Sequence, residues 1–357
     1  MKYLISGGGT GGHIFPAVSI ANALRELDPQ ADILFVGALG RMEMERVPQA
    51  GYKIIGLPVR GFNRAQPWKN ISVLIDLLRS MRMARRIIRD FRPDVGVGVG
   101  GYASGAAMKV AARMGVPILL QEQNGFAGVT NKLLRNDAAR ICVAYPGMER
   151  FFPADKIILT GNPVRQNLTS GVRRDTGRRT LLIIGGSLGA RTINRAVIDA
   201  LPALCEADID VVWQTGKTYY ERCREAWLAA GSPAHIECRD FLSDMPDRYA
   251  QADLVISRAG ASSISELCLL GKPAILVPSP NVAEDHQTHN AMALVRKDAA
   301  VLVRDDEAAE RLIPTALSLI RDTDRLQQLH TNVLALAERD SARRIAEEVM
   351  ALAKSKK

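Results

Sequence analysis

Short apolar runs alternate along this chain with longer segments in which apolar residues recur every three or four positions. The first run, Tyr3–Ile5, leads through a glycine-rich turn into an amphipathic pattern through Phe15, Val18, Ile20, Ala23 and Leu24. Short continuous runs predict buried strands, and the longer spacing predicts amphipathic helices. Regular alternation of the two patterns predicts parallel sheets covered by helices, which is the α/β class.

The strand–glycine turn–helix construction recurs three more times. Asp94–Val99 runs into a turn at 100–105, Leu181–Gly189 repeats the opening pattern, and Asp253–Ser257 leads through 259–261 into a helix expected at Ser263–Leu270. A chain of 357 residues is long enough for two cores. We therefore expect two Rossmann-like domains with a ligand held in the cleft between them.

The expected domains are residues 1–160 and 161–340, with a hinge near Thr160–Arg165, where Gly161-Asn162-Pro163 interrupts regular structure. Residues 341–357 contain an amphipathic helix, Ala342–Ala353, followed by a basic tail. We expect this helix to dock back on the first domain.

A long helix is predicted between Trp68 and Arg92. Its apolar positions are 71, 74, 75 and 78, then 77, 81, 84, 88 and 91, and its arginines are at 79, 82, 85, 86, 89 and 92. Such a helix is either a surface helix with a solvated basic face or one whose basic face lies against anionic lipid. The sequence leaves both interpretations open.

Charge is distributed unevenly. Residues 1–160 carry a net charge of +9, residues 161–340 carry −3, and residues 341–357 carry +3. This asymmetry favours an anionic partner for the first half, such as a phosphorylated substrate, a membrane surface or a nucleic acid. Aromatic residues make up only 5% of the chain and no nucleic-acid recognition motif is present, so no nucleic acid is expected.

The first glycine turn, Ser6–His13, matches a dinucleotide-binding pattern through Gly7, Gly9 and Gly12. That pattern requires an acidic residue at the end of the second strand to hold a ribose. Here the strand Ile33–Val36 ends in Gly37-Ala38-Leu39-Gly40. The turn therefore predicts a ligand other than NAD.

Three further groups are candidates for chemistry. Ser187, in the turn 185–189, and Arg165 are candidate phosphate ligands at a helix start. Glu266 either closes a capping box that begins at Ser263 or accepts the two hydroxyls of a ribose. His13 ends the first turn at the mouth of a sheet, where an imidazole can take a proton from a hydroxyl.

No metal or cofactor is expected. The five cysteines form no CxxC pair, and His286 and His289, three residues apart, have no third ligand at matching spacing. The chain also contains no apolar run of the length that a membrane crossing requires and begins with no signal-peptide pattern.

Six segments together carry a resemblance over essentially the whole chain. They are Gly8–His13, Gly100-Gly101-Tyr102 with Ser104-Gly105, Glu122–Gly125, Gly161–Arg165, Gly185-Gly186-Ser187 with Gly189-Ala190-Arg191, and Arg258 with Gly260-Ala261 and Ser265-Glu266. In order and spacing they resemble the MurG family of peptidoglycan glycosyltransferases, in glycosyltransferase family 28. The resemblance implies the GT-B fold, with two Rossmann-like domains facing a central cleft.

The resemblance also implies an activity. The chain would transfer GlcNAc from UDP-GlcNAc, with inversion, to the C4 hydroxyl of undecaprenyl-pyrophosphoryl-MurNAc-pentapeptide (lipid I), giving lipid II. It would act at the cytoplasmic face of the cell membrane as a peripheral protein bound to an anionic surface. Through peptidoglycan synthesis it would contribute to cell-wall biogenesis, cell shape and cell division.

Site residues follow from the same resemblance. His13 would be the catalytic base, residues 161–340 would bind the donor, and residues 1–160 would bind the acceptor through Gly101, Tyr102 and Ser104. The donor residues would be Thr10, Gly11, Gly12, Asn124, Arg165, Ser187, Leu242, Ala261, Ser262, Ser263, Ile264, Ser265, Glu266 and Gln287. Leu242 would contact uracil through its backbone, and Glu266 would hold the ribose. Asn124, Gln287 and Thr10–Gly12 would contact the GlcNAc.

The chain departs from the family pattern at two positions. Gln121 stands where relatives often have histidine, near the expected acceptor, and His286 stands where others carry glutamine or arginine, near the donor sugar. The alternatives to the implied activity are a UDP-sugar epimerase and a diacylglycerol glycosyltransferase of similar build. A nonenzymatic nucleic-acid-binding module is the third.

Overall fold

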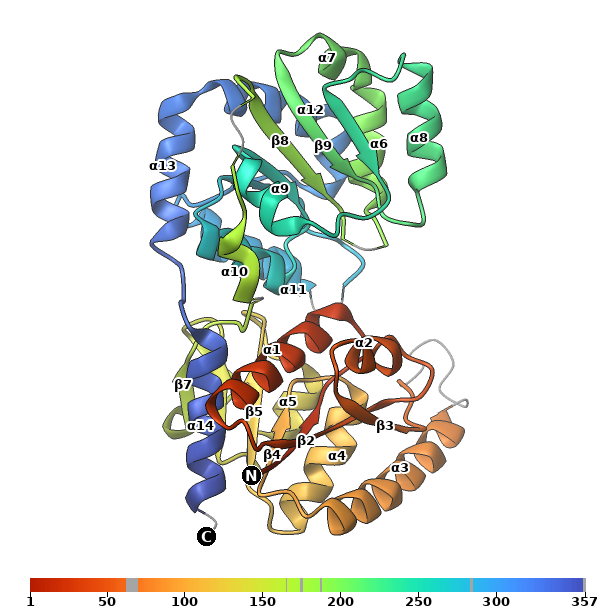
Figure 1. Ribbon diagram of the computed structural model, residues 1–357, viewed down its shortest axis with the longest axis vertical. Coiled ribbons are helices and arrows are strands. Elements are labelled where there is room, and N and C mark those ends of the chain that lie inside the picture. The colour runs from red at the N-terminus through yellow and green to blue at the C-terminus, as the bar shows by residue number, and fades with distance from the viewer. Residues whose placement is uncertain (62–69, 165, 174–175, 187, 283–284, 356–357) are drawn as a thin grey trace. The chain divides into compact units, whose positions relative to one another are not determined.

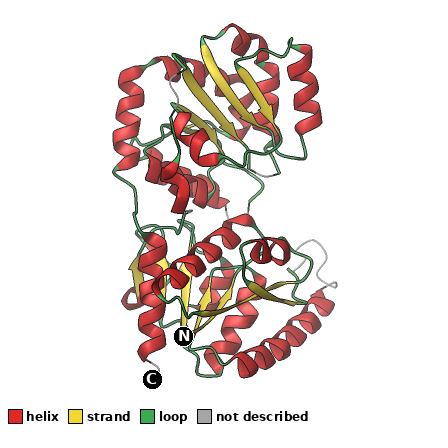
Figure 2. Ribbon diagram, viewed as in Figure 1, coloured by secondary structure: helices red, strands yellow, loops and turns green. Residues whose placement is uncertain are grey.

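The computed structural model describes residues 1–61, 70–164, 166–173, 176–186, 188–282 and 285–355. The chain forms two compact units (Figure 1). Unit 1 comprises Met1–Arg165 and Arg339–Lys357, and unit 2 comprises Gln166–Glu338. In both units helices and strands alternate along the chain (Figure 2).

Unit 1 is built on a parallel sheet of seven strands in the order β3-β2-β1-β4-β5-β6-β7. Its strands are β1 (Lys2–Ser6), β2 (Asp32–Ala38), β3 (Lys53–Leu57), β4 (Val95–Gly98), β5 (Ile118–Glu122), β6 (Arg140–Val143) and β7 (Ile157–Leu159). Its helices are α1 (Gly11–Leu27), α2 (Glu43–Gln49), α3 (Asn70–Phe91), α4 (Tyr102–Arg113), α5 (Val129–Leu134) and α14 (Ser341–Ser355).

Two hydrophobic cores cover the two faces of this sheet. On one face α1 and α14 pack together, burying Ile20 and Val349 among strand side chains such as Ile5. On the other face α3 and α4 contribute Ile88 and Met108. The last helix of the chain is thus part of unit 1 and lies beside its first helix (Figure 1).

Unit 2 is built on a parallel sheet of six strands in the order β10-β9-β8-β11-β12-β13. Its strands are β8 (Arg179–Ile184), β9 (Ile209–Gln214), β10 (Ile236–Arg239), β11 (Leu254–Ser257), β12 (Ala274–Leu276) and β13 (Val301–Leu302). Its helices are α6 (Arg191–Asp199), α7 (Leu201–Glu206), α8 (Tyr220–Ala229), α9 (Met245–Gln251), α10 (Ala261–Leu270), α11 (His286–Val295), α12 (Ala308–Arg321) and α13 (Thr323–Leu334).

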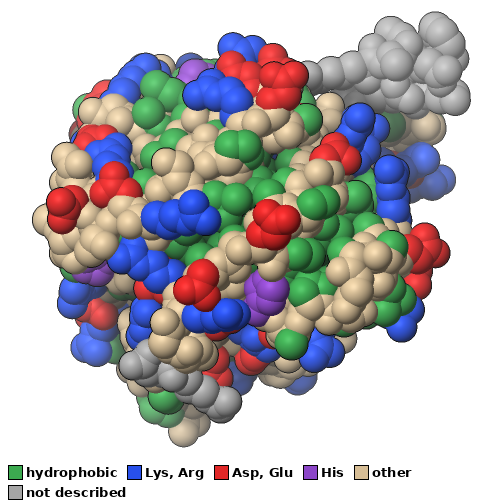
Figure 3. Space-filling view, turned by 90° about the horizontal axis from the view of Figure 1, so that it is seen from above, with side chains coloured by type: hydrophobic (Ala, Val, Ile, Leu, Met, Phe, Trp, Pro, Cys, Tyr) green, Lys and Arg blue, Asp and Glu red, His purple; other side chains and the backbone are tan. Residues whose placement is uncertain are grey.

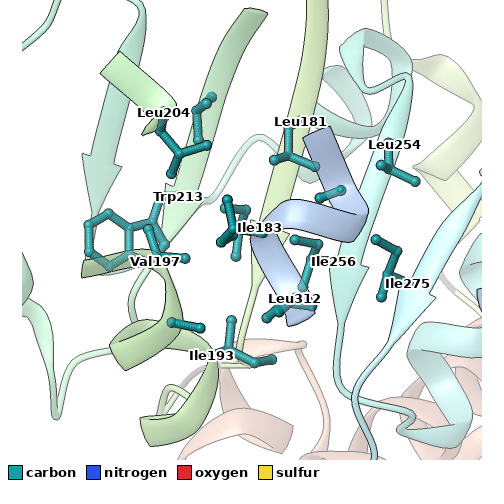
Figure 4. Close-up of a cluster of buried hydrophobic side chains, with 14 of the residues drawn as sticks. Leu181, Ile183, Ile193, Val197, Leu204, Trp213, Leu254, Ile256, Ile275 and Leu312 are labelled. Carbon is teal, nitrogen blue, oxygen red and sulfur yellow. The ribbon is translucent and has the colours of Figure 1, made fainter. Parts of the chain in front are cut away.

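The main core of unit 2 lies between its sheet and the helices α6, α7 and α12 (Figure 4). Trp213 is its largest side chain and is fully buried, with its indole N–H donating to Asn194 Oδ1 at 2.9 Å. Outside this core, on the face seen in Figure 3, acidic and basic side chains are interspersed. Exposed pairs such as Arg311 with Glu307 contribute little stability each.

The α/β class and the two parallel sheets predicted from the sequence are confirmed. In each sheet the strand order reverses once, between β1 and β4 in unit 1 and between β8 and β11 in unit 2. In open parallel sheets, ligands bind outside the carboxyl ends of the strands at this reversal. Each of the four glycine turns noted in the sequence directly follows one of these strands, β1, β4, β8 or β11.

The long basic helix is α3, and only one of its two apolar stripes enters the core. Leu77, Met81 and Ile88 pack on the sheet, whereas Leu74 and Leu78 are 50% and 57% exposed. Ile75 is also exposed. The apolar pattern therefore predicted the helix correctly, but the side chains at positions 74, 75 and 78 are exposed and do not pack in the core.

Candidate active site

Two glycine turns meet at the reversal point of the unit 1 sheet. The turn after β1 contains Gly8, and the turn after β4 contains Gly100 and Gly101, both at positive φ. A Cβ on Gly101 would lie 2.5 Å from the carbonyl oxygen of Gly8, and one on Gly100 would lie 2.8 Å from His13 Nε2. Both positions therefore need glycine for conformation and for space.

His13 lies in the first turn of α1 and is partly exposed. Its Nδ1 is 3.1 Å from the carbonyl oxygen of Gly8 and 3.3 Å from Thr10 Oγ1. Because a carbonyl oxygen only accepts hydrogen bonds, Nδ1 carries the proton in this contact. Nε2 is then the basic nitrogen of the neutral ring.

The first turn already holds a protein carboxylate. Glu43, the first residue of α2, is fully buried, and its Oε2 accepts from the backbone N–H of Gly9 at 2.9 Å. Its Oε1 accepts from the N–H of Ala38 at 3.0 Å. The sequence shows no carboxylate at the end of β2, and Glu43, five residues later, was not predicted to lie at the turn. Its side chain reaches the turn only because of the way the chain folds back between β2 and α2.

The expected acceptor residues lie beside these turns. Tyr102 begins α4 and is 55% exposed, and its ring lies against Gly61, where a Cβ would be 2.7 Å away. Ser104 is fully buried, and its hydroxyl has no hydrogen-bond partner among the described residues. Tyr102 is thus placed to meet a ligand through its side chain, whereas Ser104 packs under the turn.

Glu122 organises the loop that follows β5. Its carboxylate accepts from the N–H and side-chain amide of Asn124, from the N–H of Gly128 at 3.0 Å and from Asn131 Nδ2 at 2.9 Å. These contacts fix the expected sugar ligand Asn124. Next to it, Gln121 is fully buried and donates to Asn162 Oδ1 at 3.0 Å, so it takes part in an internal network and is not at the surface.

In unit 2, the predicted donor segment forms the first turns of α10. The helix begins at Ala261 after Gly260, and no side chain caps it. The capping box expected at Ser263 is therefore wrong: Ser263 and Ser265 lie inside the helix, and the Ser265 hydroxyl donates back to the carbonyl of Ala261 at 3.0 Å. The helix starts two residues early because Gly260, with its extended backbone, serves as N-cap.

Two side chains of this segment carry polar groups in different surroundings. The buried hydroxyl of Ser262 has no hydrogen-bond partner among the described residues. Glu266 is partly exposed, and its Oε2 accepts from the phenol of Tyr249 at 3.0 Å. Ala261 and Ile264 are buried and offer only backbone groups. No sequence pattern identified Tyr249, which comes from α9.

Leu242 lies in a loop that three polar contacts hold in place. Its side chain is buried, and its N–H donates to Gln214 Oε1 at 3.2 Å. Arg248 bridges the ends of the loop by donating to Asp244 at 2.8 Å and to Glu237 at 2.5 Å. Burial raises the pKa of Glu237, but hydrogen bonds from Arg248 and Arg239 outweigh it, so the pKa is lowered overall.

The remaining donor residues lie near these strand ends or outside the described part. Gln287, in α11, accepts from the N–H of Ser279 at 2.9 Å through its side-chain oxygen, and His286 precedes it in partly exposed surroundings. Arg165 and Ser187 lie outside the described residues. Arg258, after β11, donates to Asp305 at 2.5 Å, and Asp305 also accepts from Thr192 at the start of α6.

Neither a metal site nor a membrane-spanning helix is found in the described part of the chain. Among the residues that the structure describes, no group of three or more His, Cys, Asp or Glu side chains is arranged to hold a metal ion. Within the same part of the chain, no helix combines the length and apolar content needed to cross a membrane.

Solved structures show how widely this fold is used. A MurG from Acinetobacter baumannii is 24% identical, with a TM-score of 0.79, and the match covers 98% of this chain and 99% of that one. A putative UDP-N-acetylglucosamine 2-epimerase from Listeria monocytogenes is 16% identical, with a TM-score of 0.71 over 98% and 96% of the two chains. At these identities the likeness establishes the fold and does not separate a transferase from an epimerase.

Sequence comparison makes that separation. Residues 3–143 match the glycosyltransferase family 28 N-terminal domain, and residues 180–348 match the glycosyltransferase family 28 C-terminal domain. A UDP-N-acetylglucosamine–N-acetylmuramyl-(pentapeptide) pyrophosphoryl-undecaprenol N-acetylglucosamine transferase from Bacteroides thetaiotaomicron is 60% identical, over 99% of this chain and 98% of its own. The Porphyromonas gingivalis protein of the same name is 52% identical, over 100% and 97%. This chain therefore belongs to glycosyltransferase family 28 and, within it, to the MurG family of UDP-GlcNAc-dependent transferases.

Proposed function

We propose that this protein transfers GlcNAc from UDP-GlcNAc to the C4 hydroxyl of lipid I, forming the β-1,4 linkage of lipid II with inversion at the anomeric carbon. The observation that carries the proposal is the 60% identity, over nearly the full length of both chains, to a transferase whose name states this donor and this acceptor. The product is the disaccharide precursor of peptidoglycan.

His13 is the base in this proposal. The proton of the acceptor hydroxyl passes to Nε2 of His13 as the oxygen attacks the anomeric carbon, and UDP leaves from the opposite side. The contact from Nδ1 to the Gly8 carbonyl supports this role, because it holds the ring in the tautomer whose Nε2 can accept a proton. A positioned base contributes about 10²–10⁴-fold to such a reaction.

Unit 1 binds the acceptor. Gly101 supplies backbone at the turn beside His13, and the exposed ring of Tyr102 offers a surface for the acceptor sugar. The side chain of Ser104 is buried, so this residue supports the acceptor site from beneath the turn. Thr10, Gly11 and Gly12 lie on the same edge of the sheet and contact the donor sugar, together with Asn124.

Unit 2 binds the donor nucleotide. Glu266, held by Tyr249, accepts the ribose hydroxyls. The hydroxyl of Ser262, which has no hydrogen-bond partner among the described residues, adds a polar contact at the start of α10. The carbonyl of Leu242 accepts from uracil, since its N–H is already bonded to Gln214. The remaining donor contacts are Ala261, Ser263, Ile264, Ser265 and Gln287, with Arg165 and Ser187 at the diphosphate.

The protein works at the cytoplasmic face of the cell membrane, and α3 is its contact with the anionic surface. The exposed side chains of Leu74 and Leu78 lie on the same helix as Arg79, Arg82 and a further run of exposed arginines at 85, 86 and 89. The two acidic residues of α3 are each paired with arginine, Asp76 with Arg60 and Arg79 and Asp90 with Arg89. The arginines of α3 outnumber its acidic residues, and a helix with exposed apolar side chains beside such a basic face suits an anionic membrane interface.

The activity can be tested with purified protein, UDP-GlcNAc and a lipid I analogue. We expect UDP release and a β-1,4-linked disaccharide product that depend on the acceptor, and loss of about 10²–10⁴-fold in kcat for His13→Ala. Conversion of UDP-GlcNAc without acceptor indicates the epimerase alternative. Preference for diacylglycerol in an acceptor competition indicates the glycolipid synthase.

A further inference from the structure

Glu43 is a buried carboxylate that forms no ion pair with any described residue, and it lies directly under the first glycine turn. Its two oxygens accept from two backbone N–H groups, those of Gly9 and Ala38. A Cβ on Gly8 would overlap its carboxylate, and a Cβ on Gly37 would lie 2.6 Å from its Cγ. Two glycines therefore leave the room that this side chain occupies.

The contact with Gly9 matters because of what lies on the other side of the same peptide group. The N–H of Gly9 and the carbonyl of Gly8 belong to one peptide bond, and in a trans peptide they point in opposite directions. The N–H donates to Glu43 Oε2 at 2.9 Å, and the carbonyl accepts from His13 Nδ1 at 3.1 Å. One peptide thus joins the carboxylate to the imidazole.

We propose that Glu43 is a positioning residue for His13, acting through the Gly8–Gly9 peptide; the inference rests on the proposed role of His13 as the base. A hydrogen bond to a carboxylate polarises the peptide and makes its carbonyl a stronger acceptor, because hydrogen bonds in a chain strengthen one another. The stronger acceptor holds the proton on Nδ1 and the ring in one orientation. Nε2 is thereby kept as the nitrogen that takes the proton from the acceptor hydroxyl.

In many enzymes a carboxylate orients a catalytic histidine by direct contact. Here Glu43 would do the same through the intervening Gly8–Gly9 peptide. Glu43 itself takes no proton and touches no substrate. Its bond to Ala38 also ties the end of β2 to the turn, so a purely structural role predicts lower stability when Glu43 is changed. The experiments must separate that effect from an effect on His13.

The first test compares Glu43→Gln with Glu45→Gln, an exposed glutamate two residues further along α2. We expect kcat of Glu43→Gln to fall about 10- to 100-fold, less than loss of the base itself. The KM for UDP-GlcNAc should stay within about 2-fold, because the nucleotide is bound by unit 2. Glu45→Gln should match wild type. Unchanged kcat in Glu43→Gln, or a loss confined to KM, overturns the proposal.

The second test is a double-mutant cycle with His13→Ala. If Glu43 acts through His13, adding Glu43→Gln to His13→Ala lowers the residual kcat by less than about 2-fold, because coupled residues are not additive. If Glu43→Gln lowers kcat as much in the His13→Ala protein as in wild type, Glu43 acts independently of His13. That result overturns the inference and leaves the proposed function intact.

The third test observes the tautomer of His13 directly and needs no variant of Glu43. The ¹⁵N chemical shifts of the His13 ring in the wild-type protein, assigned by comparison with His13→Ala, report which nitrogen carries the proton. We expect the Nδ1–H tautomer. The Nε2–H tautomer in wild type overturns the proposal. If instead His13→Ala is fully active while Nδ1–H is observed, the positioning stands and the role of His13 as base is wrong.

Discussion

The phenol of Tyr249, a residue only 1% exposed, donates a hydrogen bond of 3.0 Å to the carboxylate of Glu266. Tyr249 comes from α9 and Glu266 from the second turn of α10, so the bond joins two helices that flank β11. It holds one oxygen of the carboxylate in place. In the proposed function this carboxylate accepts the ribose hydroxyls, so the bond from Tyr249 orients it before the donor binds.

Removing this bond should weaken donor binding. We expect Tyr249→Phe to raise the Kd for UDP-GlcNAc about 5-fold, equivalent to about 1 kcal/mol, because Glu266 must then be ordered by the ligand itself. Isothermal titration calorimetry measures this change. Tyr52→Phe is the matched control, since it removes a tyrosine hydrogen bond of 2.6 Å to Asn22 in unit 1. Equal affinities of Tyr249→Phe and wild type would show that Glu266 needs no such support.

The crossing of the two glycine turns in unit 1 predicts unequal costs for two similar substitutions. Gly115 and Gly101 both have positive φ, at 76° and 90°, but a Cβ on Gly115 meets nothing within 4 Å. We expect Gly115→Ala to cost about 1–2 kcal/mol from backbone strain. Gly101→Ala should cost at least about twice as much, since its Cβ would press on the Gly8 carbonyl.

Thermal unfolding followed by circular dichroism checks this comparison, and the transferase assay adds a second readout. Gly101→Ala should also lose activity, because the Gly8 carbonyl that it displaces holds His13. Gly115→Ala should keep wild-type kcat. Identical unfolding midpoints for the two variants would mean that the turns can move apart without cost.

Lys272 gives unit 2 a pH-dependent stability. Its ammonium is partly buried at the end of α10, where it donates to the carbonyl of Ala252 at 2.8 Å. Burial, and secondarily the charge of Arg173, lower its pKa from 10.5 to about 8. Between pH 8 and 10.5 the unfolded chain therefore binds the proton that the folded chain has released. The free energy of unfolding due to this group must rise with pH across that window, and its destabilising effect is fully present below pH 8.

Urea unfolding of wild type and Lys272→Met at pH 7, 8, 9 and 10 measures this contribution. The difference in unfolding free energy between the two proteins should move in favour of wild type as the pH rises from 8 to 10. Lys297→Met, which removes an exposed lysine of unit 2, should run parallel to wild type. Parallel curves for Lys272→Met would contradict the lowered pKa.

The exposed apolar side chains of α3 predict a membrane-binding defect that leaves the chemistry intact. We expect Leu74→Glu with Leu78→Glu to reduce co-sedimentation with vesicles rich in anionic phospholipid at least about 10-fold, because apolar burial is lost and repulsion is added. Turnover of a short-chain, water-soluble acceptor should be unchanged. Leu228→Glu, at an exposed leucine of α8 in unit 2, is the control. Undiminished vesicle binding would leave α3 as a solvated surface helix.

Much of the fold could be read from local sequence. Each strand was found within one or two residues where a short apolar run is followed by a glycine turn, as with Asp253–Ser257 for β11. The start of α10 was misplaced because the Ser263–Glu266 pattern imitates a capping box. The extended backbone at Gly260 serves as the N-cap and begins the helix earlier, which the residue types alone do not show.

The candidate site was predictable only in part. The motifs identified residue types that bear chemistry, such as His13 and Glu266, since these stand in the glycine turns and helix starts that follow strands. Glu43, which accepts from the turn before His13, and Tyr249, which donates to Glu266, stand in no motif. They reach the site only after α2 and α9 have packed on their sheets.

By itself, the order of apolar and polar residues determined the α/β class, the two parallel sheets and the placing of glycine turns at their carboxyl ends. These features depend on hydrophobic burial and backbone sterics within short segments of chain. Only the tertiary structure decided which apolar side chains of α3 stay exposed, and which carboxylate lies behind the peptide that faces His13. Such relationships join residues far apart in the sequence, and hydrogen bonding and packing select them only once the sheets have assembled.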